Sequence, residues 1–132
     1  CRVFVESVKA RVEAANCFFY PDVLVTCDPR DRATPEYVSH PLLVAEVLSE
    51  STAAFDRGDK FAAYRKLETL TDYVLVDVAA KRIEIFRRDP QNHWVLYAYG
   101  PGETIELSSL GVNLAVDAVL EDTEEATPEA QA

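Results

Sequence analysis

The chain has 132 residues, of which 48% are hydrophobic, and it carries a formal net charge of −10. This length fits one domain, and no apolar run reaches the roughly 18 residues that are needed to cross a bilayer. The first residues lack the basic, apolar and small-residue segments of a signal peptide, so we expect a cytoplasmic protein without a membrane partner. The negative charge argues against a basic surface that would bind nucleic-acid phosphates.

The first half of the chain predicts several strands. Residues 3–14 carry valines among polar residues and favour one or two strands. Residues 17–27, CFFYPDVLVTC, predict a further strand with Pro21 at its opening, where a missing amide donor is tolerated. The polar residues 28–40 predict a loop. Residues 41–49, PLLVAEVLS, form an almost continuous apolar run, which is typical of a central strand that is covered on both faces.

The second half predicts one helix followed by more strands. Residues 56–67, DRGDKFAAYRKL, predict the helix, with Asp56 as its N-cap. Residues 72–78, 82–88 and 94–99 predict three strands in a meander, and 101–114 a short return segment. This order of elements predicts an α/β or α+β fold in which a mixed sheet is crossed by a helix.

The cysteines and the acidic C-terminal end carry less information. Cys1, Cys17 and Cys27 form no C-x-x-C pair, so we expect buried or incidental thiols rather than a zinc site or a disulfide framework. We divide the chain into a folded domain of residues 1–117 and an acidic tail of residues 118–132, which we expect to be disordered. The last twelve residues hold five acids, and without them the net charge is still −5.

Glu46 is the most informative residue, because it places an ionisable group within an apolar strand. Burying an unpaired carboxylate costs several kcal/mol, so Glu46 must meet a cation, a metal or a proton. A buried salt bridge or a neutral acid in the core would satisfy it without any function. Asp22 also lies at the head of an apolar strand, although such a residue is often part of a turn. Two acids at one sheet end would suit Mg²⁺ or Mn²⁺.

Lys60 is the third candidate, in the first turns of the helix that follows the Glu46 strand. A lysine at this place could hold a water or a phosphate and stabilise developing charge. It could equally be a surface lysine or the partner of Asp56 four residues earlier. Tyr64 lies one turn further on the same helix face and could line the site.

Taken in order, four segments carry a resemblance that no single motif carries. YPDVLVTC, LLVAEVLSEST, FDRGDKFAAYRKL and DYVLVDV closely resemble the Uma-two family of restriction-endonuclease-like proteins, within the PD-(D/E)XK nuclease superfamily. The resemblance covers roughly residues 3–115. It places the motif's Pro-Asp on Pro21 and Asp22 and its second acid on Glu46. The lysine of the usual E-x-K pattern would fall on Leu48, and the matching lysine is Lys60 in the following helix.

The resemblance implies a metal-dependent endonuclease that hydrolyses DNA phosphodiester bonds. Asp22 and Glu46 would hold Mg²⁺ or Mn²⁺, Lys60 would complete the catalytic set, and Tyr64 would line the site. Related nucleases also carry an N-terminal helix, which we expect upstream of Cys1, and they often form homodimers. The alternative is a catalytically inactive nuclease-fold domain that acts in protein interaction or regulation, which the net charge and Leu48 favour.

Overall fold

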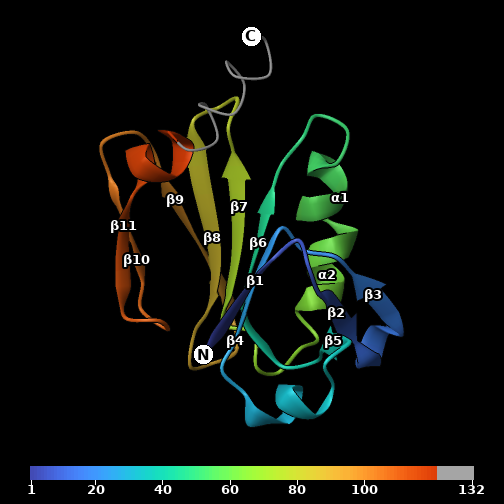
Figure 1. Ribbon diagram of the computed structural model, residues 1–132. Coiled ribbons are helices and arrows are strands. Elements are labelled where there is room, and N and C mark those ends of the chain that lie inside the picture. The colour runs from blue at the N-terminus through green and yellow to red at the C-terminus, as the bar shows by residue number, and fades with distance from the viewer. Residues whose placement is uncertain (122–132) are drawn as a thin grey trace, which may run out of the picture.

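The computed structural model describes residues 1–121 and is built around a six-stranded mixed sheet. In spatial order its strands are β1 (Arg2–Val5), β4 (Val23–Thr26), β6 (Pro41–Val47), β7 (Asp72–Asp77), β8 (Arg82–Arg88) and β9 (Trp94–Tyr99). Only β6 and β7 pair in parallel within this sheet, and α1 (Ala53–Arg57) and α2 (Asp59–Tyr64) connect them (Figure 1). The predicted α+β architecture with a mixed sheet and a helical crossover after the Glu46 strand is therefore confirmed.

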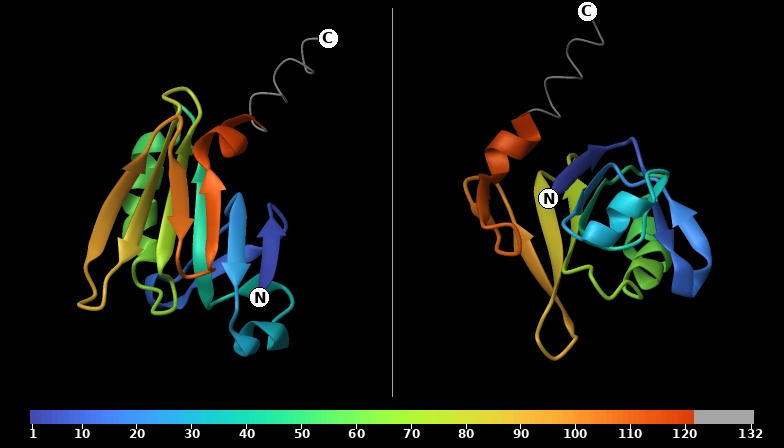
Figure 2. Two further views of the ribbon diagram at one scale, coloured as in Figure 1. Left: turned by 90° about the vertical axis from the view of Figure 1, so that its left-hand side faces the viewer. Right: turned by 60° about the horizontal axis from the view of Figure 1, so that its bottom comes forward.

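The two faces of the sheet are covered by different elements. Helices α1 and α2 lie on one face, together with a second sheet of β3 (Cys17–Phe19), β2 (Lys9–Val12) and β5 (Tyr37–Val38). The hairpin of β10 (Thr104–Leu107) and β11 (Val112–Ala115) and a helix over 116–121 lie on the opposite face (Figure 2). Each face has its own apolar core, because side chains alternate between the two faces along every strand.

Several element boundaries differ from those predicted. Residues 17–27 form two strands in two different sheets, because the chain leaves β3 before Pro21 and enters β4 after it. The predicted loop 28–40 contains the 3₁₀ helix Pro29–Ala33 as well as β5, and a second 3₁₀ helix, Glu13–Ala15, links β2 to β3. The return segment 101–114 forms most of the β10–β11 hairpin.

The predicted helix 56–67 begins earlier than expected and is interrupted. Thr52 occupies the N-cap position of α1, so the prediction of Asp56 as the cap was wrong. The break falls at Gly58, where an added Cβ would lie 3.0 Å from the Ala54 carbonyl oxygen. A side chain at this position would therefore press on the preceding turn.

Two expectations concern the ends of the chain. Cys1 and Cys27 form a disulfide that joins the start of β1 to the end of β4, so the prediction of incidental thiols was wrong for these two; only Cys17 is free. The register explains the pairing, because Arg2 lies opposite Thr26 and the next residues outward meet. The helix over 116–121 includes the first residues of the predicted tail, and the rest of that tail lies outside the described residues. The predicted N-terminal helix would precede Cys1 and stays a prediction.

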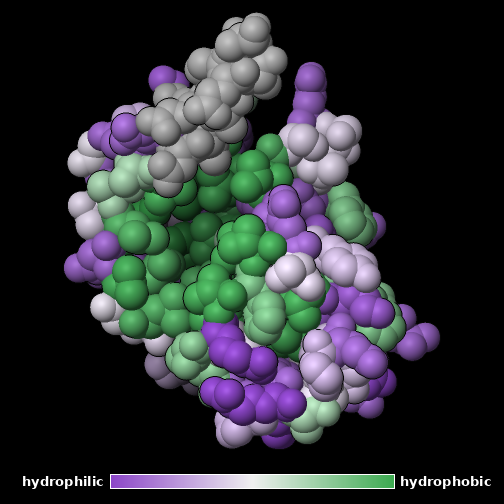
Figure 3. All heavy atoms as spheres, viewed as in Figure 1, coloured by the Kyte–Doolittle hydropathy of each residue, from purple (hydrophilic) through white to green (hydrophobic). Residues whose placement is uncertain are grey.

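Part of the sheet face that carries the hairpin is open. The β10–β11 hairpin and helix 116–121 cover strands β7 and β8, whereas Val3 and Val5 of β1 are each 64% exposed on that face. Between these regions runs an apolar groove with a volume of about 350 Å³, visible as the hollow of hydrophobic side chains in Figure 3. In residues 1–121, no helix has the length and apolar character needed to span a membrane.

Candidate active site

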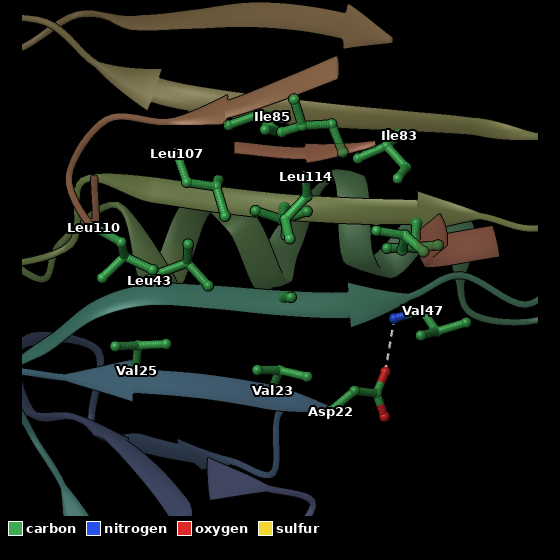
Figure 4. Close-up of a pocket in the computed structure, with 15 residues that line it drawn as sticks. Asp22, Val23, Val25, Leu43, Val47, Ile83, Ile85, Leu107, Leu110 and Leu114 are labelled. Carbon is green, nitrogen blue, oxygen red and sulfur yellow. Dashed lines mark hydrogen bonds between the residues drawn. The ribbon is translucent and has the colours of Figure 1, made fainter. Parts of the chain in front are cut away.

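The predicted acids meet because β4 and β6 are antiparallel neighbours. Val23 lies opposite Ala45, so Asp22 and Glu46 come together where β4 begins and β6 ends. Each carboxylate accepts a hydrogen bond from the main chain of the other strand end: the Asp22 amide donates to Glu46 Oε1 at 3.2 Å, and the Val47 amide donates to Asp22 Oδ2 at 2.7 Å. Figure 4 shows the second bond, with Asp22 at the end of the apolar groove. These bonds fix both carboxylates relative to the strand ends.

Glu46 is buried beneath the helices, with its side chain only 4% exposed. It shares a sheet face with Val44, which packs in the helix-side core. Its Oε2 atom lies 2.5 Å from Lys60 Nζ. Among the described residues no donor reaches this atom with hydrogen-bond geometry, so the contact is an ion pair. Burial raises the pKa of the Glu46 carboxyl above its ordinary value, and the Lys60 ammonium acts in the opposite direction.

Lys60 reaches Glu46 from α2. Its side chain is 14% exposed, and its ammonium also lies 3.4 Å from Asp56 Oδ1. The rings of Phe19 and Phe55 lie 5.6 and 5.9 Å from Lys60 Nζ, within the range of cation–π contacts. The alternative of a solvated surface lysine is therefore excluded, whereas its predicted pairing with Asp56 is present alongside the one with Glu46.

Leu48 occupies the place of the missing strand lysine. Its amide donates to the Val76 carbonyl at 2.8 Å, which continues the β6–β7 hydrogen bonding one residue beyond Val47, the end of β6. Its side chain packs against the same helix-side core. The ammonium next to Glu46 therefore comes from α2 and not from the strand.

Tyr64 is further from the surface than a site-lining residue would be. It is 0% exposed and packs against Phe19 and Tyr73, with ring centroids 4.9 and 5.5 Å apart. Its hydroxyl has no hydrogen-bond partner in the part of the chain that the structure describes. Burial, and next to it the nearby Glu46 carboxylate, raise the pKa of this hydroxyl well above its ordinary value. Tyr64 is therefore a buried, neutral phenol near Glu46.

Sequence reasoning missed a second ion pair on the same row of the sheet. Glu46 lies opposite Leu75, and Leu75 lies opposite Glu84, so both glutamates face the helices with one strand between them. The Glu84 carboxylate pairs with Arg57 of α1. The alternation of Ile83 and Ile85 with charged residues only indicated a half-buried strand, and the partner of Glu84 depends on the helix packing that sequence does not show.

The two carboxylates suit a divalent cation in their chemistry. Asp22 and Glu46 bring carboxylate oxygens to the same end of the sheet, where β4 begins and β6 ends. The single Lys60 ammonium faces the carboxylates of both Glu46 and Asp56, so it does not balance their negative charge. Residues 1–121 contain no cluster of three or more His, Cys, Asp or Glu side chains arranged to hold a metal. Two carboxylates are nevertheless a sufficient protein share for Mg²⁺, which usually keeps several waters and also binds substrate phosphates.

Comparisons with known proteins agree with the resemblance seen in the sequence. Residues 1–117 match the family Uma2, whose description is "Putative restriction endonuclease". Two uncharacterised proteins of Synechocystis are 37% identical over 119 residues and 33% identical over 113 residues. These matches cover 90% and 83% of this chain, but only 63% and 64% of the two relatives. The chain thus spans less than two thirds of their length.

One solved structure shares the fold. It is the crystal structure of a protein from Anabaena variabilis that is described as a putative nuclease belonging to DUF820. The TM-score is 0.67 at 15% sequence identity, and the match covers 91% of this chain and 68% of that one. At this identity the similarity establishes the fold alone.

Proposed function

This chain belongs to the Uma2 family, and from that membership we propose that it is a metal-dependent endonuclease that hydrolyses DNA phosphodiester bonds. The observation that carries the proposal is the meeting of Asp22, Glu46 and Lys60 from three separate elements at one end of the sheet. A purely structural domain would need a cation for Glu46, but it would not need a second carboxylate beside it.

Each residue has a distinct part in the proposed reaction. Asp22 and Glu46 would hold Mg²⁺ or Mn²⁺, which when bound would activate a water and polarise the scissile phosphate. The Lys60 ammonium would orient the attacking water and stabilise the negative charge that develops on the phosphate. Phe19 and Phe55 would restrict the motion of Lys60 and shield it from solvent. Tyr64 would support Glu46 from below rather than contact the substrate.

Partners and location remain part of the proposal. DNA would have to approach a chain with a net charge of −10, so we expect binding to require divalent cations and to weaken as monovalent salt rises. A homodimer, which we predict, would place two sites on one duplex. The cytoplasmic location stays a prediction, and the Cys1–Cys27 disulfide counts against it because reducing compartments rarely retain such bonds.

Calorimetric titration of Mn²⁺ tests the proposed site. We expect saturable binding by the parent chain, loss of binding in Glu46→Gln, and retention in Glu84→Gln. Glu84 is the matched control because it is another partly buried, ion-paired glutamate on the same row of the sheet. A nicking assay on supercoiled plasmid with Mn²⁺, with and without a chelator, would then follow the same three proteins.

A second function is also supported by specific observations, and it is the one we would favour if the parent chain did not bind Mn²⁺. The net charge of −10, the leucine at position 48 and the open apolar groove fit an inactive nuclease-fold domain that acts in protein interaction or regulation. No Mn²⁺ binding by the parent, or equal binding by Glu46→Gln, would favour this alternative. In that case Glu46 and Lys60 would be a structural ion pair.

A further inference from the structure

Asp56 is a buried carboxylate to which the resemblance gave no part in the proposed catalytic set. It lies in α1, is 3% exposed, and its Oδ1 atom is 3.4 Å from Lys60 Nζ. Its main-chain carbonyl accepts a hydrogen bond from the Tyr73 hydroxyl at 2.8 Å, which anchors this turn of α1 to β7. The backbone of Asp56 is therefore held independently of its side chain, and the carboxylate is free to serve Lys60.

Lys60 thus sits between two buried carboxylates rather than in a simple pair. Its ammonium contacts Glu46 from one element and Asp56 from another, whereas the neighbouring Arg57 has one such partner, Glu84, among its described contacts. Two carboxylates and one ammonium leave a formal charge of −1. If Glu46 served only to neutralise Lys60, or Lys60 only to neutralise Glu46, burying Asp56 as well would add a desolvation cost without need.

We propose that Asp56 is a positioning residue that keeps the Lys60 ammonium at the site when Glu46 binds the metal. This inference rests on the proposed function. A cation on Asp22 and Glu46 would compete with Lys60 for Glu46, and without a second carboxylate the lysine would be free to swing into solvent. With Asp56 in place, the ammonium stays beside Glu46, where the attacking water and the phosphate would be.

A chemical test measures this hold without metal or activity. Glu46→Gln removes the negative charge of Glu46 and so imitates a Glu46 that is bound to a metal. In this variant Asp56 alone should hold the Lys60 ammonium in place. We expect acetic anhydride to acylate Lys60 several-fold faster in Glu46→Gln/Asp56→Asn than in Glu46→Gln, with exposed Lys66 as the internal reference in peptide mass spectrometry. Equal rates in the two variants would overturn the proposal, even if the protein proves to be an active nuclease.

Kinetics test whether Asp56 acts through Lys60. We expect Asp56→Asn to lower kcat by about tenfold or more, the usual cost of losing a supporting partner. KM for DNA should not change, because the buried side chain cannot contact substrate. Asp56→Glu should recover most of the loss, and Asp59→Asn, which removes the same charge from an exposed position, should have no effect.

The same loss should vanish in a Lys60→Ala background. An equal loss there would show that Asp56 acts by another route and would overturn the proposal. Failure of the proposed nuclease function is seen separately, as absent Mn²⁺ binding by the parent, while the acylation comparison still decides whether Asp56 holds Lys60.

Discussion

Replacing Lys60 by methionine should make stability strongly dependent on pH. The substitution keeps an unbranched side chain of nearly the same length but leaves the buried carboxylates of Glu46 and Asp56 without their shared cation. Removing one partner of a buried ion pair costs about 3 kcal/mol or more, a large share of the roughly 5–15 kcal/mol that stabilises a typical domain. The loss should grow as pH rises, because Glu46 then has to be buried as an anion.

The sign of the pH effect follows from the direction of the pKa shift. Burial already raises the pKa of Glu46 above its ordinary value of 4.5, and losing Lys60 removes the main opposing influence. An acid with a raised pKa in the folded state binds more protons when folded, so the free energy of unfolding falls as pH rises from 4.5 through the raised pKa. The slope within that window is about 1.4 kcal/mol per pH unit. Acidification should therefore restore much of the stability of Lys60→Met.

Urea denaturation at pH 5, 6, 7 and 8 measures this effect. The triple variant Glu46→Gln/Asp56→Asn/Lys60→Met is the control, because it removes the ammonium together with both buried carboxylates that face it and should lose the added pH dependence. Equal losses of stability at pH 5 and pH 8 in Lys60→Met would contradict the burial of a Glu46 anion. A triple variant with the same pH profile as Lys60→Met would contradict it too.

Three further predictions concern the surroundings of the site. Asp22→Asn should keep the hydrogen bond from the Val47 amide and the fold, yet weaken Mn²⁺ binding about tenfold or more in a calorimetric titration; unchanged affinity would remove Asp22 from the ligand set. Tyr64→Phe should leave stability unchanged or raise it by up to about 1 kcal/mol in urea melts, because the hydroxyl has no described partner, and a clear loss would reveal one. Reducing the Cys1–Cys27 disulfide, which spans 26 residues, should lower the free energy of unfolding by about 3 kcal/mol, and coincident urea curves with and without reductant would contradict this.

Patterns that depend on neighbouring residues were predicted well. The apolar run around Glu46 gave the central strand β6, and the alternation after residue 72 gave the meander β7–β8–β9. The burial of Glu46 followed from the same run, because an acid within such a strand cannot avoid the core. Its partner Lys60 was predicted only from the resemblance in motif order. Twelve or more residues separate Glu46 from Lys60, so local patterns do not show that this lysine returns to Glu46.

Features set by tertiary pairing were missed. The run of strand-forming residues around Pro21 contributes one strand to each of two sheets. No local pattern indicates with which neighbouring strand each half will pair. The Cys1–Cys27 disulfide depends on the register of β1 against β4, which the sequence does not specify. Asp is a common residue type at helix N-caps, which is why Asp56 was predicted as one. Only the path of α1 and α2 over the sheet brings its side chain close to Lys60.

Because Lys60 lies on a helix and not on the Glu46 strand, substitutions in the core far from the site should be able to change its position. A strand lysine two residues from Glu46 would keep its place through local backbone geometry alone. Here the spacing of carboxylate and ammonium is set by how α2 rests on the sheet, through the stack of Phe61 on Tyr73, whose ring centroids are 4.9 Å apart. Small losses of packing in that contact should shift Lys60 away from Glu46 before they unfold the domain, so the geometry of the proposed site should respond to core substitutions that leave the overall fold intact.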